Sequence, residues 1–119
     1  MRLTKSDVVK YINDLVSHSS HLYIANDKEC KAFASQIGRN VSKMVNLACE
    51  IPHKNRCILN IVQVTFEDGY IESVLAYNNV LKVKCAYSII SDNTTFETLD
   101  LDDEDWQVDL QRMYSSECR

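Results

Sequence analysis

The chain has 119 residues, of which 45% are hydrophobic and 25% charged, with only two glycines and one proline. This composition is typical of one folded domain and excludes a collagen-like or linker-rich chain; no apolar run reaches the roughly 18 residues of a membrane-spanning helix. The formal net charge of −4 makes the chain a poor nucleic-acid binder, because neutralisation of phosphates dominates that affinity.

Charge is distributed unevenly along the sequence. Residues 1–56 carry nine Lys and Arg against five Asp and Glu, whereas residues 57–119 carry four against twelve. The net charges of the two halves are therefore +4 and −8. The positive half either binds an acidic partner or faces the acidic half of its own chain, and the sequence leaves both open.

A first helix is expected over residues 6–18. Ser6 can cap its N-terminus, and Asp7 lies in the first turn, where a negative charge is favourable. The apolar side chains fall on one face, as in a helix that packs on a core: Val8, Ile12, Leu15 and Val16.

A second, long helix is expected to begin at residue 26 or 27 and to end near residue 50, before Pro52. Asn26 and Glu29 have the spacing of a capping box. Gly38 would lie inside this helix and weaken it by about 1 kcal/mol. The apolar residues recur in steps of four and three, which indicates a broad core-facing stripe: Cys30, Ala34, Ile37, Val41, Met44 and Ala48.

An antiparallel sheet of three or four strands is expected after the helices. Residues 57–66 are rich in β-branched side chains, and Asp68-Gly69 is a strong hairpin signal before a returning strand at 70–79. Residues 80–90 alternate between apolar and polar side chains, which indicates one buried face. A short strand at 95–101 would carry acidic residues that protect an exposed edge.

The C-terminal segment, residues 102–119, is acidic and is expected to form a short helix. Trp106, Leu110 and Met113 recur at helical spacing, and acidic residues suit a helix start. This stripe either docks on the chain's own sheet or inserts into a groove of a partner. The predicted architecture is thus α+β, with two N-terminal helices packed on one face of the sheet in a single domain over residues 1–101, followed by this segment.

The sequence contains no recognisable set of reactive groups. It has no P-loop, GxGxxG, HExxH or GxSxG motif, so we expect neither an enzyme nor a cofactor. Cys49, His53 and Cys57 are equally spaced but supply three ligands where structural zinc takes four, so a zinc or thiol protein is kept only as an alternative. Five scattered cysteines and an N-terminus without a signal-peptide pattern indicate an intracellular, cytoplasmic protein, with the nucleus left open.

The order of helix, helix and antiparallel strands over residues 8–101 resembles the Tctex-type dynein light chains. The best local match is "YIANDKECKAFASQIGRNVSKMV", which has an aromatic residue, a short acidic loop and the long second helix; "SIISDNTTFETLDL" is a looser one. The chain departs from that family at Tyr77-Asn78, where the family tends to carry a Trp-Asp pair. The resemblance implies a dimeric adaptor that holds an extended peptide of its partner as an added strand.

We therefore expect a non-enzymatic protein–protein interaction module, either an adaptor or light-chain-like subunit or a small subunit of a larger assembly. Its expected partner is another protein or a second copy of the chain, and neither nucleic acid nor a membrane. The strand from Leu81 to Ile89 either takes up a partner strand or is internal to the sheet, and the sequence leaves both open. Strand addition there and docking of the C-terminal stripe on a partner give the predicted contact residues: Leu81, Val83, Cys85, Tyr87, Ile89, Trp106, Leu110 and Met113.

Overall fold

The computed structural model describes residues 3–77, 80–91, 93–98 and 105–118. The elements in these ranges are α1 (Lys5–His18), β1 (Leu22–Ile24), α2 (Asp27–Ile37), β2 (Val41–Glu50), β3 (Ile58–Phe66), β4 (Tyr70–Tyr77), β5 (Val80–Ser88), β6 (Thr94–Thr98) and α3 (Asp105–Glu117).

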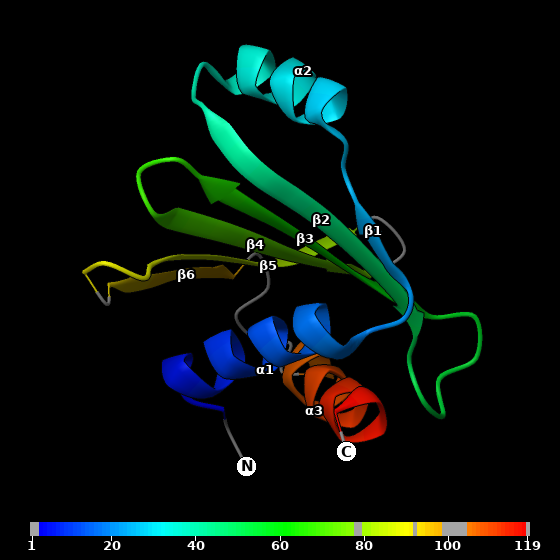
Figure 1. Ribbon diagram of the computed structural model, residues 1–119. Coiled ribbons are helices and arrows are strands. Elements are labelled where there is room, and N and C mark those ends of the chain that lie inside the picture. Colours follow the sequence, from blue (N-terminus) through cyan, green and yellow to red (C-terminus); the bar gives the residue numbers. More distant parts are fainter. Residues whose placement is uncertain (1–2, 78–79, 92, 99–104, 119) are drawn as a thin grey trace.

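The six strands described form one antiparallel sheet in which the spatial order is the chain order, β1 to β6. Helices α1 and α3, from opposite ends of the chain, lie together on one face, and α2 stands on the other side beside β2 (Figure 1). The expectation of an α+β fold is confirmed. The expected three or four strands are wrong, and the two helices that share a face are α1 and α3 rather than α1 and α2.

The first helix forms as its sequence pattern predicts. All four apolar residues of its expected core face are buried: Val8, Ile12, Leu15 and Val16. Its N-cap is Thr4 rather than the expected Ser6. The Thr4 hydroxyl accepts from the Asp7 amide, and the Asp7 carboxylate accepts from the Thr4 amide, so the two residues form a capping box.

The predicted long second helix is wrong beyond residue 37. The capping box of Asn26 and Glu29 is confirmed, but Gly38 has a φ of 68° and ends α2 in the left-handed conformation that glycine adopts without steric cost. The chain then becomes β2. Its buried side chains recur every second residue, as a strand requires: Val45, Leu47 and Cys49.

The short strand β1 was not expected from the sequence. Its three residues pair with residues 45–47 of β2. This pairing exists only because β2 is a strand, so the error in the second helix also hid β1.

The rest of the sheet follows the predicted meander, with shifted ends. The hairpin at Asp68-Gly69 is confirmed, with a φ of 89° at Gly69. The last two residues of the returning strand expected at 70–79, Asn78 and Asn79, lie outside the described residues. Because β5 ends at Ser88, Ile89 is 73% exposed in the following turn, and its predicted place on the buried face is wrong.

The core lies between the sheet and the α1–α3 layer. Trp106, Leu110 and Met113 are buried there, with 7%, 0% and 1% of their surfaces exposed. The stripe of these three residues therefore docks on its own chain, which is one of the two alternatives that the sequence left open. The described part of residues 102–119, α3, therefore shares one core with α1 and the sheet rather than standing apart from a domain that ends at residue 101.

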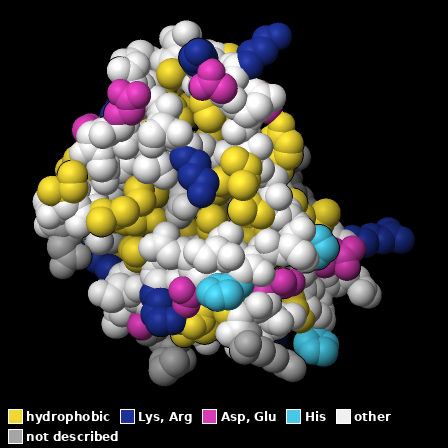
Figure 2. Space-filling view, in the orientation of Figure 1, with side chains coloured by type: hydrophobic (Ala, Val, Ile, Leu, Met, Phe, Trp, Pro, Cys, Tyr) yellow, Lys and Arg dark blue, Asp and Glu magenta, His cyan; other side chains and the backbone are white. Residues whose placement is uncertain are grey.

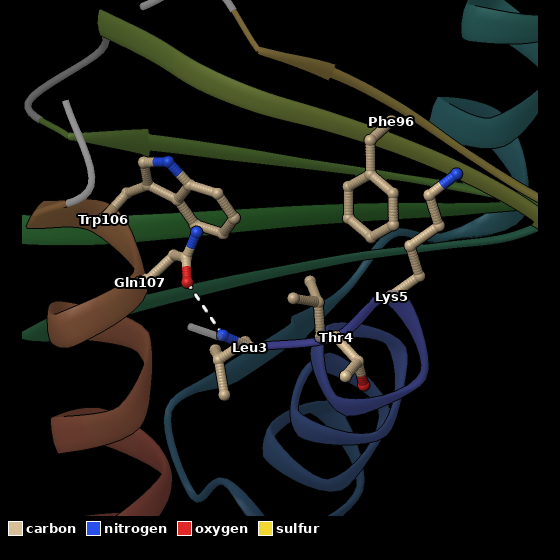
Figure 3. Close-up of a pocket in the computed structure, with 7 residues that line it drawn as sticks. Leu3, Thr4, Lys5, Phe96, Trp106 and Gln107 are labelled. Atoms are coloured by element: carbon tan, nitrogen blue, oxygen red, sulfur yellow. Dashed lines mark hydrogen bonds between the residues drawn. The ribbon is translucent and has the colours of Figure 1, made fainter. Parts of the chain in front are cut away.

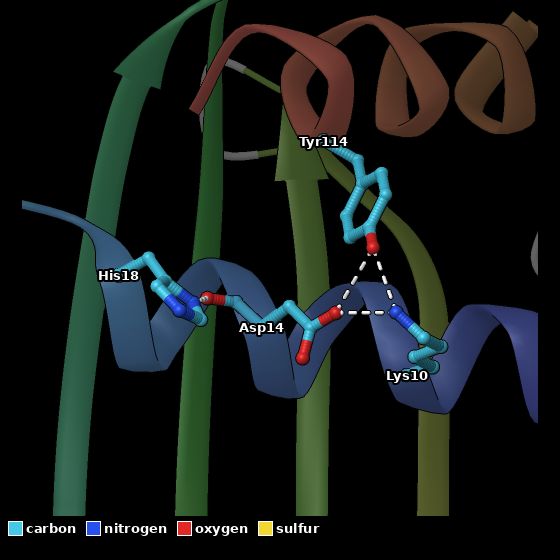
Figure 4. Close-up of polar contacts among 4 residues, drawn as sticks. All are labelled: Lys10, Asp14, His18 and Tyr114. Atoms are coloured by element: carbon cyan, nitrogen blue, oxygen red, sulfur yellow. Dashed lines mark hydrogen bonds and ion pairs between the residues drawn. The ribbon is translucent and has the colours of Figure 1, made fainter. Parts of the chain in front are cut away.

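Polar contacts join α3 to the rest of the chain beside this core. Lys10 donates to Asp14 and to the Tyr114 hydroxyl, at 2.7 Å in each case, and that hydroxyl donates to Asp14 at 3.1 Å (Figure 4). The Tyr11 and Tyr114 rings stack with their centroids 4.0 Å apart. Hydrogen bonds from Lys10 and Tyr114 hold the pKa of Asp14 below its ordinary value.

We predict that Leu110→Ala lowers the free energy of unfolding by about 2–5 kcal/mol, because it removes a fully buried side chain and leaves a cavity. Val108→Ala, on the exposed side of the same helix, should change it by no more than about 0.5 kcal/mol. Urea unfolding followed by circular dichroism measures both. Equal, small effects of the two substitutions would show that α3 does not contribute to the core.

Candidate functional site

The three residues suggested by the sequence for a metal site do not form one in the structure. Among the described residues, no three His, Cys, Asp or Glu side chains gather closely enough to hold a metal ion. Cys49 is buried at the end of β2, His53 lies in the β2–β3 loop, and Cys57 precedes β3. The zinc or thiol alternative therefore has no geometric support here.

The buried thiols of Cys49 and Cys85 are also poor nucleophiles. Burial raises the pKa of Cys85 to about 11 and raises that of Cys49, to which the charge of Glu117 also contributes. A thiol must ionise to attack a substrate or bind a metal, so a raised pKa disfavours both.

A buried polar cluster joins α1 to the middle of the sheet. The Gln63 amide of β3 donates to Tyr87 at 2.9 Å, to Asn13 at 3.1 Å and to Ser73 at 3.3 Å. The Tyr87 hydroxyl in turn donates to Asn13 at 2.6 Å. Because these groups satisfy one another, the cluster positions α1 on β3, β4 and β5 and offers no free reactive group. Burial raises the pKa of Tyr87 to about 12.

The predicted contact strand, β5, is not available for strand addition. It pairs with β4 on one side and, over residues 83–87, with β6 on the other, so the backbone groups of these residues are already bonded. Val83, Cys85 and Tyr87 are buried on the core face, as their alternation indicates; the side chain of Leu81 lies outside the described set. Trp106, Leu110 and Met113 are also buried. These buried residues, which the sequence predicted to contact a partner, stabilise the core instead of presenting a surface.

The surface that stands out instead is the side of the sheet away from α1 and α3, which we call the open face. Alternate residues of β2 to β5 point to it because successive side chains of a strand point to opposite faces. Its partly exposed apolar members include Met44, Val62, Val74, Ala76 and Ala86. Figure 2 shows hydrophobic side chains gathered over the sheet. In register, Val62 lies between Asn46 of β2 and Val74 of β4.

Arg39 closes the end of the open face next to α2. Its guanidinium lies 3.8 Å from the centroid of the Phe66 ring and 5.6 Å from that of Tyr70, and it donates to Asp68 at 2.7 Å. The bond from Arg39 holds the pKa of Asp68 below its ordinary value. Phe66 and Val64 are buried at this end, so the exposed part of the face is its centre.

An ion pair lies on the open face beside the apolar centre. Lys84 of β5 and Glu72 of β4 are 4.0 Å apart and both partly exposed. Lys84 is opposite Val74 in register, and Glu72 is opposite Ala86. The face thus combines apolar side chains with this ion pair, and the exposed Glu97 of β6, opposite Lys84 in register, adds a further carboxylate on the same side.

Sequence reasoning missed the open face although part of the signal was present. The alternation at residues 80–90 already predicts one buried face and one face toward solvent. The contribution of β2 was not visible, because residues 41–50 were expected to be helical.

The fold and this surface define an α+β protein in which α1 and α3 cover one face of the sheet and α2 lies at one end of the other. In comparisons with known proteins, no family model, no curated protein and no solved structure matches the chain. In the described residues, no helix is long and apolar enough to span a membrane.

We predict that the free energy of unfolding falls as the pH rises above about 9. In the folded protein, burial raises the pKa of Cys85 from 9.0 to about 11 and that of Tyr87 from 10.0 to about 12. In this pH range the unfolded chain therefore binds fewer protons than the folded protein. Each of the two groups lowers the free energy of unfolding by an amount that approaches about 1.4 kcal/mol per pH unit.

Urea unfolding between pH 8 and 11 tests this, with Cys85→Ala as the comparison. Because that variant lacks one of the buried thiols, its loss of stability between about pH 9 and 10 should be smaller than in the parent protein, and the rest comes from Cys49, whose pKa burial also raises. A flat profile for the parent up to pH 11 would contradict the prediction.

Proposed function

We propose that the protein is a non-enzymatic interaction module that pairs with a second copy of itself through the open face of its sheet. The observation that carries the proposal is the uncovered, partly apolar centre of that face, around Val62 and Val74. Apolar surface that one face of a sheet leaves in water gains free energy when another surface covers it.

The size of the open face suits a dimer. Strands β2 to β5 at a spacing of about 4.8 Å, with about eight residues each at about 3.3 Å, give a flat area on the order of 500 Å². The exposed part is smaller than this, because Val64 and Phe66 are buried at the end next to α2. An interface of standard size, with roughly 800 Å² buried on each partner, would therefore also include the flanking parts of β1 and α2.

The charges on the open face favour a second copy over an unrelated partner. In a twofold dimer, residue i contacts residue j and residue j contacts residue i. An axis passing between Glu72 and Lys84 therefore sets the lysine of each copy against the glutamate of the other. A face that carries both charges side by side is complementary to itself.

Such a dimer agrees with the adaptor or light-chain-like function expected from the sequence, although through a sheet face rather than a strand edge. A partner that adds a strand would have to use an outer strand, β1 or β6, since each pairs on one side only within the described sheet. We also propose an intracellular setting, which is supported by five cysteines that are all free thiols.

We predict that the parent protein has twice its chain mass in solution and that Val62→Asp gives a folded monomer, because a buried, unpaired charge disfavours the interface. Val108→Asp is the matched control: it places the same charge on an exposed valine of α3, away from the open face, and should leave the dimer intact. Light scattering after size exclusion measures the mass, and circular dichroism checks the fold. A parent protein that is monomeric at about 100 µM would contradict the proposal.

Exchange of the two charges provides a sharper test of the same interface. Lys84→Glu alone should weaken the dimer at least tenfold, because it sets like charges against each other. Combining it with Glu72→Lys restores opposite charges and should recover most of the lost affinity. If the double variant is as weak as the single one, the twofold arrangement is wrong.

A further inference from the structure

A cavity of about 380 Å³ opens where α1 and α3 begin, next to β6. Its size lies in the range of small-ligand sites. The apolar side chains that line it in the described residues are Leu3, Val8, Phe96 and Trp106. Figure 3 shows Phe96 and Trp106 projecting toward it from different elements. The cavity lies on the helix side of the sheet, so it is separate from the open face.

Gln107 places a buried amide group at this cavity. The side chain is 95% buried, since only 5% of its surface is exposed, and its Oε1 accepts from the Leu3 amide at 2.9 Å. That bond fixes the orientation of the amide group, so Nε2 lies on the side of Trp106 (Figure 3). Within the described residues Nε2 has no hydrogen-bond partner, and a buried donor without one costs about 1–3 kcal/mol. A ligand that brings an acceptor would remove this cost.

Positive charge surrounds the same cavity. Lys5 lines it, with its ammonium 5.9 Å from the centroid of the Phe96 ring. Thr4, the N-cap of α1, lines it too, so the positive end of the helix dipole lies at this site. No carboxylate of a described residue lines the cavity, and the nearby Asp7 is engaged in the capping box.

We infer that this cavity binds a carboxylate that carries an apolar chain. The carboxylate would accept from Gln107 Nε2, the charge of Lys5 on the Phe96 side of the cavity would attract it, and the apolar chain would lie against Trp106. Such a group occurs in a free monocarboxylic acid and at the C-terminus of a polypeptide. The inference is independent of the dimer proposed above, because it uses the other side of the sheet.

The fluorescence of Trp106 reports on the cavity directly, because it is the only tryptophan of the chain. Titration with octanoate should change it saturably. Octanol, which has the same chain without the charge, should bind at least tenfold more weakly, and acetate, which has the charge without the chain, should have no effect. Equal binding of octanol and octanoate would overturn the inference, as would the lack of a saturable change with any probe.

Two variants test the residues assigned to the carboxylate. Lys5→Gln should weaken octanoate binding at least tenfold and leave octanol binding unchanged, whereas Lys28→Gln, which removes an exposed charge on α2, should bind octanoate like the parent. Gln107→Glu keeps an acceptor for the Leu3 amide but replaces the donor with a negative charge, so it should abolish octanoate binding. Thermal unfolding without ligand checks that each variant is folded; a folded Lys5→Gln that binds octanoate normally would contradict the assignment.

Peptides distinguish the two sources of the carboxylate. Acetyl-Ala-Ala-Leu with a free C-terminus is compared with the same peptide as an amide. Saturable binding of the free form alone assigns the site to a chain end, and binding of octanoate without either peptide assigns it to a free acid. Binding of the amide as tightly as the free form would overturn the role of the carboxylate.

Discussion

The packing of α3 onto α1 and the sheet is the contact on which the rest of the structure depends. It brings Leu110 and Met113, near the end of the chain, against a helix that starts at residue 5. Closing so long a loop costs conformational entropy, and burial of apolar surface must offset it. Because both helices use the same face of the sheet, the other face keeps its apolar centre uncovered.

Buried polar groups give this packing a single arrangement. Gln63, Tyr87 and Asn13 can satisfy one another only when α1 lies at one position along the strands. Asp109 of α3, with 1% of its surface exposed, accepts from Lys54 of the β2–β3 loop at 2.7 Å. A shift of either helix would leave a buried polar group unpaired, which is more costly than the loss of an apolar contact of similar size.

The two surfaces to which we assign binding lie on opposite sides of the sheet. The open face is a product of where the helices pack, and the cavity is a product of where they begin. A dimer that covers the open face would leave the cavity beside Lys5 and Trp106 accessible. The two proposed contacts would therefore not compete, because they use opposite sides of the sheet.

Local signals in the sequence were enough for the elements that are defined by their own residues. The helical period of α1, the capping box at Asn26 and the glycine of the β3–β4 hairpin depend on nearby positions alone, and the structure has all three. The alternation of β5 likewise predicted that Val83 and Cys85 are buried. It could not show that strands on both sides would deny this strand to a partner.

Only the tertiary structure decided residues 41–50, the docking of α3 and the face of the sheet that stays open. In the sequence alone, the apolar residues of β2 fit the period of a helix and the alternation of a strand equally well. Pairing with residues 22–24 and 58–66 selects the strand, and the left-handed Gly38 lets the chain turn into it. Such choices depend on contacts between segments that are far apart in the chain, and the period of a single segment carries no information about its partners.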